Sequence, residues 1–344
     1  MGASLAVMAR VRHARLFHPK PRVDRLPIVL SRRTALLAVL GAAQSLASCS
    51  RQAASPSAVL HVGDQRGAIR SLLRAAGELQ GAPYRIEWNV FPVGAPLIEA
   101  MKAGAVDFGY VGSSTMTFGL ASGAGLKAIN VWRFTGPGSG LLVRGDGPVH
   151  SLAELRGRRI AVVRGSPGHL LVVEALRAAN IPLEAVALVF LSAGDAKAAL
   201  ASGSIDAWSI WDPYLAIAEQ DGGRILATSQ QLAPEVECGV ASENAVARKR
   251  PQLLDFMARV QRAYAWAQTH MDAMAEAYAA DTGVPLDIAR IVQNRMRVQV
   301  LSRVTDEAIA THQQAADVYA DIGLIPRRID IAEVYDRSFV LPGA

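Results

Sequence analysis

Residues 108–115 read Phe108-Gly109-Tyr110-Val111-Gly112-Ser113-Ser114-Thr115, an apolar run that ends at a glycine and continues into small polar residues. A helix-compatible segment follows, which predicts a strand, a tight loop and a helix in succession. The same order returns at Arg159–Val163, a loop at 165–169 and His169–Ala179. Strands that alternate with helices in this way predict parallel sheets covered by helices.

The alternation extends outward from both units. The remaining strands are expected at Val59–Val62, Ile86–Phe91, Ala128–Trp132, Gly140–Val143, Ala187–Leu191, Ala207–Ile210, Arg224–Ala227 and Glu237–Ala241. Beyond Cys238 the pattern predicts helices almost throughout, because apolar residues recur at helical spacing. We therefore predict an α/β fold with two lobes, 59–143 plus 239–344 and 144–238, each a mostly parallel sheet flanked by helices, with a helical C-terminal part.

Ligands of parallel sheets lie at the carboxyl ends of the strands. The candidate ligand-binding residues in the loops that follow strands are Gln65, Arg66, Gly112, Ser113, Ser114, Gly165, Ser166, Gly168, His169, Trp211 and Asp212. Ser114 and Ser166 each stand where a helix begins, and the free N–H groups of a helix N-terminus attract anions. Two such termini facing one cleft would form a pair of anion sites, although each serine could equally be a plain helix cap.

The first 48 residues have the composition of an export signal. A basic segment ends at Arg32-Arg33, and the apolar run 35–47 is too short to span a bilayer. The order Leu46-Ala47-Ser48-Cys49 resembles the bacterial lipobox, so we expect lipidation at Cys49 and a polar tether over 49–58. A chance cysteine beside an ordinary signal peptide is the alternative. The arginine pair leaves both twin-arginine and general secretion open, and the true start codon can lie downstream of Met1.

The charge distribution argues against a nucleic-acid partner. The chain carries a net +6, but its first 48 residues hold eight basic residues and one acid. The rest therefore has 28 basic and 29 acidic side chains, a nearly neutral body with no electrostatic footprint for nucleic acid. With one further cysteine, Cys238, and no zinc-type spacing, we expect no metal, no cofactor and no internal disulfide.

Four stretches together resemble the nitrate/sulfonate/taurine group of periplasmic binding proteins, closest to the aliphatic-sulfonate-binding branch. They are Val62–Gly67, Gly104–Gly112, Ser151–Gly157 and Gly203–Tyr214. The resemblance implies a two-lobed (type II) fold that closes on its solute, an ABC permease as partner, a periplasmic or cell-surface location and a monomer. It also implies that Gln65 meets an oxygen of the ligand, while Trp211 covers its organic part.

The chain departs from the family pattern in the loop at 165–169. Pro167 stands where a side-chain donor is common, and proline has no N–H to offer an anion. The exact solute therefore stays open: an aliphatic sulfonate is favoured over nitrate, taurine, a thiamine-precursor pyrimidine or an aromatic acid. Asp212 could accept from an amine or simply cap the next helix.

An enzyme on the same fold is the competing class. A desulfinase needs a reactive cysteine, and Cys238 lies within a predicted strand, where a buried structural role is expected. No nucleophile elbow, P-loop or zinc-protease motif occurs in the sequence. We therefore predict a binding protein rather than an enzyme. A sensor lobe would need the same pocket, so the sequence does not separate it from a transport protein.

Overall fold

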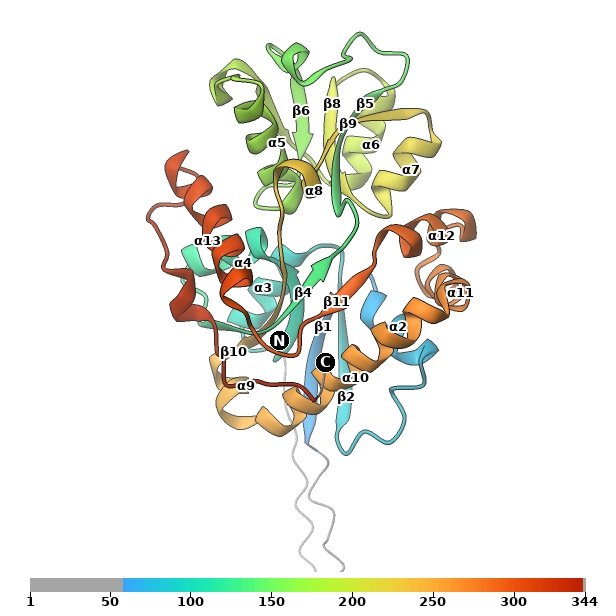
Figure 1. The fold of residues 1–344 in the computed structure, drawn as a ribbon, viewed down its shortest axis with the longest axis vertical. Coiled ribbons are helices and arrows are strands. Elements are labelled where there is room, and N and C mark those ends of the chain that lie inside the picture. Colours follow the sequence, from blue (N-terminus) through green and yellow to red (C-terminus); the bar gives the residue numbers. More distant parts are fainter. Residues whose placement is uncertain (1–57, 343–344) are drawn as a thin grey trace, which may run out of the picture. The chain divides into compact units, whose positions relative to one another are not determined.

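The computed structural model describes residues 58–342, and the expected signal peptide, lipidation site and most of the tether lie outside this range. The described chain contains two mixed sheets flanked by helices, connected by two crossings of the chain (Figure 1). We call each sheet with its helices a lobe. No helix within these residues is both long and apolar enough to cross a bilayer.

Lobe 1 is built on a six-stranded sheet in the order β11-β4-β10-β3-β1-β2. The strands are β1 (Val59–Gln65), β2 (Arg85–Phe91), β3 (Phe108–Gly112), β4 (Leu126–Phe134), β10 (Glu237–Ser242) and β11 (Val298–Val300). Every residue of β3 is buried, as expected for a strand covered on both faces. β10 runs antiparallel to both of its neighbours, β3 and β4.

Helices cover both faces of this sheet, and a separate core lies on each. One core includes residues of α2 (Ala68–Ala75), α10 (Arg250–Thr269), α11 (Met271–Thr282) and α12 (Leu286–Arg295). The other includes residues of α3 (Gly94–Lys102), α4 (Ser113–Ala121) and α13 (Asp306–Asp321). The short helix α9 (Glu243–Arg248) links β10 to α10 (Figure 1).

Lobe 2 has a five-stranded sheet in the order β7-β6-β8-β5-β9. Its elements are β5 (Ser139–Arg144), β6 (Arg159–Val162), α5 (Pro167–Ala178), β7 (Ala187–Phe190), α6 (Ala193–Ala201), β8 (Ala207–Trp211), α7 (Tyr214–Gln220), β9 (Gly223–Thr228) and α8 (Ser229–Leu232). Three short 3₁₀ turns, η1 (Leu152–Leu155), η2 (Leu183–Ala185) and η3 (Ile331–Val334), complete the described elements. Tyr319 of α13 packs in the core of lobe 2, so this helix touches both lobes.

Each strand expected from the sequence is present, and two expectations need correction. The sheets are mixed rather than mostly parallel, because β10 and β5 run antiparallel to their neighbours. β5 belongs to lobe 2, so the chain crosses at 135–138 and again at 233–236, not at 143/144 and 238/239. β11 was not expected, because three residues give too little periodicity to detect.

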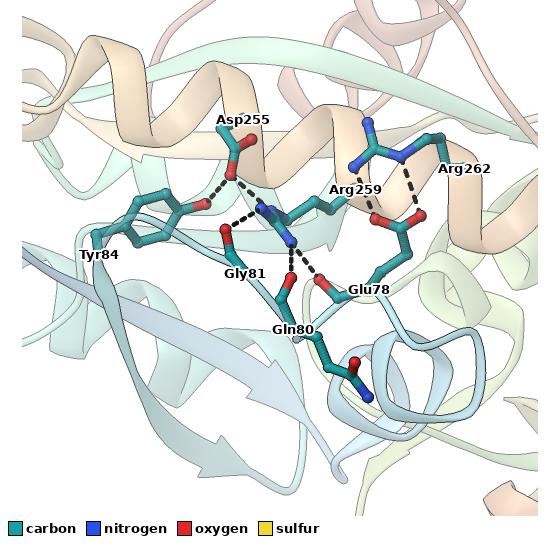
Figure 2. Close-up of polar contacts among 7 residues, drawn as sticks. All are labelled: Glu78, Gln80, Gly81, Tyr84, Asp255, Arg259 and Arg262. Carbon is teal, nitrogen blue, oxygen red and sulfur yellow. Dashed lines mark hydrogen bonds and ion pairs between the residues drawn. The ribbon is translucent and has the colours of Figure 1, made fainter.

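A buried arginine fastens α10 to the turn between α2 and β2, as Figure 2 shows. Arg259 is 8% exposed, and its guanidinium donates to the carbonyl oxygens of Glu78, Gln80 and Gly81 at 2.7–3.2 Å. Its Nε also donates to Asp255 at 2.6 Å. The neighbouring Arg262 pairs with the Glu78 carboxylate but is half exposed. Arg259 therefore satisfies three backbone carbonyls of this turn.

We predict that Arg259→Ala lowers the free energy of unfolding by about 3 kcal/mol, because it leaves buried carbonyls and Asp255 without their partner. Arg262→Ala is the matched control and should cost less than about 1 kcal/mol, as exposed ion pairs do. Urea unfolding of the two variants measures both values. Equal losses of unfolding free energy in the two variants would contradict the conclusion that Arg259 holds this turn.

Candidate ligand-binding site

A cavity of about 310 Å³ lies between the two sheets. The four loops that contain the predicted ligand-binding residues, near 65, 112, 165 and 211, all contribute to its wall. Its lining includes residues 63–66 from lobe 1, residues 163–167 and 211–213 from lobe 2, and both crossings. Helices α10, α11 and α12 add side chains such as Tyr264, Tyr278 and Gln293. The volume is at the lower end of the usual range for small-molecule sites.

The lobes touch across this cavity. A Cβ on Gly112 would stand 3.0 Å from the Pro167 ring, so the absence of a side chain lets the two loops approach. Thr115 Oγ1 donates to the carbonyl of Gly165 at 3.3 Å, and Arg66 Nη1 donates to the Tyr214 hydroxyl at 2.6 Å. The cavity is therefore bounded by contacts between lobes on more than one side.

Seven of the expected site residues line the cavity, and four do not. Those that line it are Gln65, Arg66, Gly112, Gly165, Ser166, Trp211 and Asp212. Gln65 Nε2 donates to the Tyr110 carbonyl at 2.8 Å, so its amide already has a protein acceptor. Arg66 lies over the Tyr214 ring, and its Nε is buried without a hydrogen-bond partner among the described residues.

Ser113, Ser114, Gly168 and His169 are placed behind the cavity wall, which corrects the expectation that they face a ligand. Gly168 packs against the Ser209 carbonyl. His169 is fully buried, and its Nδ1 accepts from the Gly165 N–H at 3.3 Å. Burial lowers the His169 pKa to about 4, so the ring is neutral at physiological pH. Its role is to shape the loop.

Two helix N-termini of lobe 1, those of α2 and α4, are satisfied by the protein's own carboxylates. Glu235 accepts from the backbone N–H of Ser114 at 3.0 Å and from the hydroxyls of Ser113 and Ser114. Asp64 accepts from the N–H groups of Ile69 and Arg70 at the start of α2. The expected anion site at α4 is therefore already filled by a carboxylate.

The helix N-termini of lobe 2 are also capped from within. Asp212 accepts from the Ala216 N–H at 3.0 Å, which bears out its alternative role as a helix cap. At α5 the Ser166 hydroxyl accepts from His169 N–H, and Pro167 offers no donor. The expected pair of free helix termini is thus absent from the described cavity.

The sequence reading missed the two glutamates of the second crossing. Glu235 and Glu237 both line the cavity, Glu237 as the first residue of β10 and Glu235 two residues before it. Burial raises the Glu235 pKa to about 7; burial and then repulsion from Glu235 raise the Glu237 pKa to about 8. The Pro234-Glu235-Val236-Glu237 pattern was the available signal, since residues two apart on a strand share a face.

Cys238 lies outside this cavity and has the buried structural role expected of it. It is fully buried, and its sulfur is 3.3 Å from the Tyr335 hydroxyl. Burial raises its pKa to about 12, so it remains a thiol and is a poor nucleophile. Among the described residues, no cluster of three side chains could hold a metal ion.

A family model described as NMT1/THI5 like matches residues 92–274, more than half of the chain. This chain belongs to the NMT1/THI5-like family. It is 29% identical over 283 residues to a putative aliphatic sulfonates-binding protein of Escherichia coli K12, covering 81% of this chain and 88% of that protein.

Solved structures similar to this NMT1/THI5-like chain include two sulfonate-binding proteins. The periplasmic aliphatic sulphonate binding protein SsuA from Escherichia coli matches with 27% identity and a TM-score of 0.74, over 84% of this chain and 95% of that one. The alkanesulfonate-binding protein SsuA from Xanthomonas axonopodis pv. citri, bound to MOPS, matches with 26% identity and a TM-score of 0.75, over 82% and 99%. The expected periplasmic-binding-protein fold is confirmed.

The raised pKa of Glu237 predicts that the stability of this NMT1/THI5-like protein depends on pH. The folded state holds the Glu237 proton more tightly than the unfolded chain. The carboxyl's stabilising contribution is therefore complete below pH 4.5 and is lost as the pH rises to about 8. Glu237→Gln cannot ionise, so it should exceed the wild type in stability at pH 8.5 by at least about 1.4 kcal/mol, the equivalent of one pKa unit.

Urea unfolding at pH 4.5 and pH 8.5 measures this difference. The matched control is Glu184→Gln in η2, where the side chain is exposed and the substitution should change little at either pH. If Glu237→Gln changed the free energy of unfolding by the same amount at both pH values, ionisation of this carboxyl would not destabilise the protein.

Proposed function

We propose that this protein is the solute-binding component of an ABC importer and that it binds an organic sulfonate in the cavity between its lobes. Its relatives named for aliphatic sulfonates align over most of its length, which supports this class of solute. We further propose that it is exported, anchored through a lipidated Cys49 and monomeric when it meets its permease.

The observation that carries the proposal is the state of Arg66 within the cavity. Its guanidinium bridges the lobes through Tyr214, while its Nε is buried with no acceptor among the described residues. A buried donor without a partner costs free energy, and an oxygen of a bound ligand would satisfy it. Guanidinium groups suit sulfonate oxygens because several donors lie in one plane.

Trp211 supports an organic solute rather than a bare inorganic anion. Its side chain lines the cavity from lobe 2, and Tyr110, Trp132 and Tyr264 line it from lobe 1. Apolar surface of this extent would cover a hydrocarbon chain, which nitrate lacks. The contacts between Arg66 and Tyr214 and between Thr115 and Gly165 cross from one lobe to the other, so we propose that they re-form each time the lobes close on a solute.

A thermal-shift screen tests the class of solute. The panel contains alkanesulfonates, taurine, nitrate, aromatic carboxylates and the thiamine-precursor pyrimidine. A ligand at 100 times its dissociation constant should stabilise the protein by about 2.7 kcal/mol, a shift of several degrees. A shift with sulfonates supports the proposal, whereas a shift confined to another class would replace the solute.

We predict that Arg66→Gln weakens sulfonate binding at least about tenfold, because a charge-assisted hydrogen bond contributes roughly 1.5–3 kcal/mol. Arg70→Gln is the matched control, since Arg70 has the same charge but an exposed side chain on α2. Isothermal titration calorimetry with the sulfonate found in the screen measures both variants. Unchanged affinity in Arg66→Gln would remove Arg66 from the ligand site.

A further inference from the structure

Helix α7 of lobe 2 contacts lobe 1 from its first residue to its last. The hydroxyl of Tyr214 accepts from Arg66 at 2.6 Å, and Nε2 of Gln220 donates to Asp287 of α12 at 2.6 Å. Between these ends, Ala216 is 1% exposed and packs in the lobe 1 core that also holds residues of α2, α10, α11 and α12. The lobes therefore meet beside the cavity as well as across it.

Arg295 of α12 pairs with two carboxylates of lobe 2 on this surface. Its Nη1 lies 3.6 Å from Asp212 Oδ1, and its Nη2 forms an ion pair with Glu219 of α7. The side chain of Arg295 is 23% exposed and that of Asp212 only 4%, so solvent screens this pair weakly. Arg295 Nη1 has no hydrogen-bond partner in the described chain, so charge alone attracts it to Asp212.

Asp212 connects these ion pairs to the cavity wall. It lines the cavity, and its carboxylate accepts from the Ala216 N–H at 3.0 Å. Burial raises the pKa of Asp212, and the nearby charge of Arg295 acts against that rise. Arg295 and Glu219 lie outside the residues that line the described cavity. The Arg295 ion pairs can therefore act on a solute only through the position of lobe 2.

The first crossing passes directly over the end of α12. A Cβ on Gly136 would stand 1.9 Å from the carbonyl oxygen of Arg295, so only glycine allows this approach. The N–H of Thr135 donates to the carbonyl of Arg297 at 2.9 Å. The backbone of Arg295 is thus held beside a segment that connects the lobes, while its guanidinium reaches across to lobe 2. Separation of the lobes would break both ion pairs.

We propose that Arg295 is a positioning residue that holds the two lobes together through Glu219 and Asp212, and so sets the affinity for every solute without touching any. Of the proposed function, this inference uses only the closing of the lobes and not the class of solute. Contacts between lobes outside the ligand site stabilise the closed form whatever it encloses. Loss of Arg295 should therefore speed the release of all solutes by one common factor, while their association rates stay nearly unchanged.

The test is stopped-flow tryptophan fluorescence on the whole protein, with ethanesulfonate and butanesulfonate as solutes. Arg295→Gln should release both solutes at least about fivefold faster than the wild type. Arg295→Lys keeps the charge and should retain most of the slow release. Arg290→Gln is the matched control, because Arg290 lies on the same helix and pairs only with the exposed Asp272 of lobe 1 among the described residues. It should release both solutes at the wild-type rate.

Two further measurements separate the ion pair from a general loss of structure. Glu219→Gln should also speed release, and the double variant Glu219→Gln/Arg295→Gln should release little faster than Arg295→Gln alone, because both changes remove one interaction. The Arg295 ion pairs need no solute to form. Small-angle X-ray scattering should therefore give a larger radius of gyration for ligand-free Arg295→Gln than for the wild type and Arg290→Gln, with circular dichroism confirming that all three are folded.

Release rates that change by clearly different factors for the two sulfonates would show that Arg295 contacts the solute, and would overturn its positioning role. Release as fast in Arg295→Lys as in Arg295→Gln would overturn it too, because the charge would then be irrelevant. An unchanged radius of gyration in Arg295→Gln would have the same consequence. Failure of both sulfonates to bind the wild type would overturn the proposed function alone, and the scattering comparison would then decide the role of Arg295.

Discussion

The position of β10 between β3 and β4 is the constraint on which the cavity depends. This strand enters lobe 1 directly from the second crossing and runs antiparallel in the middle of the sheet. Its register is fixed by close packing, because a Cβ on Gly239 would stand 2.9 Å from Asn130 and 3.0 Å from the Tyr110 ring. A shift of one residue would turn Glu237 away from the cavity.

The same strand links the two lobes to the ligand site. Because β10 begins where the crossing ends, Glu235 and Glu237 lie at the junction between the two lobes. Tyr319 of α13 adds a second link, with its hydroxyl 3.0 Å from Ser114 Oγ and 3.2 Å from the Ser166 carbonyl. The second crossing and Tyr319 thus each connect the cavity wall to both lobes.

Internal carboxylates give the site its electrostatic character. Asp64, Asp212 and Glu235 each accept from N–H groups at a helix N-terminus, so these positive helix ends stabilise the protein's own acids. Among the side chains that line the cavity, Arg66 keeps a buried donor without a partner in the described chain. The binding surface differs in kind from the pair of backbone anion sites that the loop sequences suggested.

Local sequence determined most of the fold. Strands such as 108–111 and the helices after them follow from short-range periodicity, and the four loops were correctly placed around one cleft because carboxyl ends of strands gather at one edge. The buried role of Cys238 also followed from its place within a strand. These features depend on residues near one another in the chain.

Tertiary structure alone decided which loop atoms remain available to a ligand. Ser114 looked free in sequence, yet Glu235, 121 residues away, occupies its N–H and hydroxyl. The assignment of β5 to lobe 2 and the antiparallel course of β10 were likewise set by pairing between distant strands. Such contacts depend on which segments meet in space, and no local pattern of hydrophobicity records that choice.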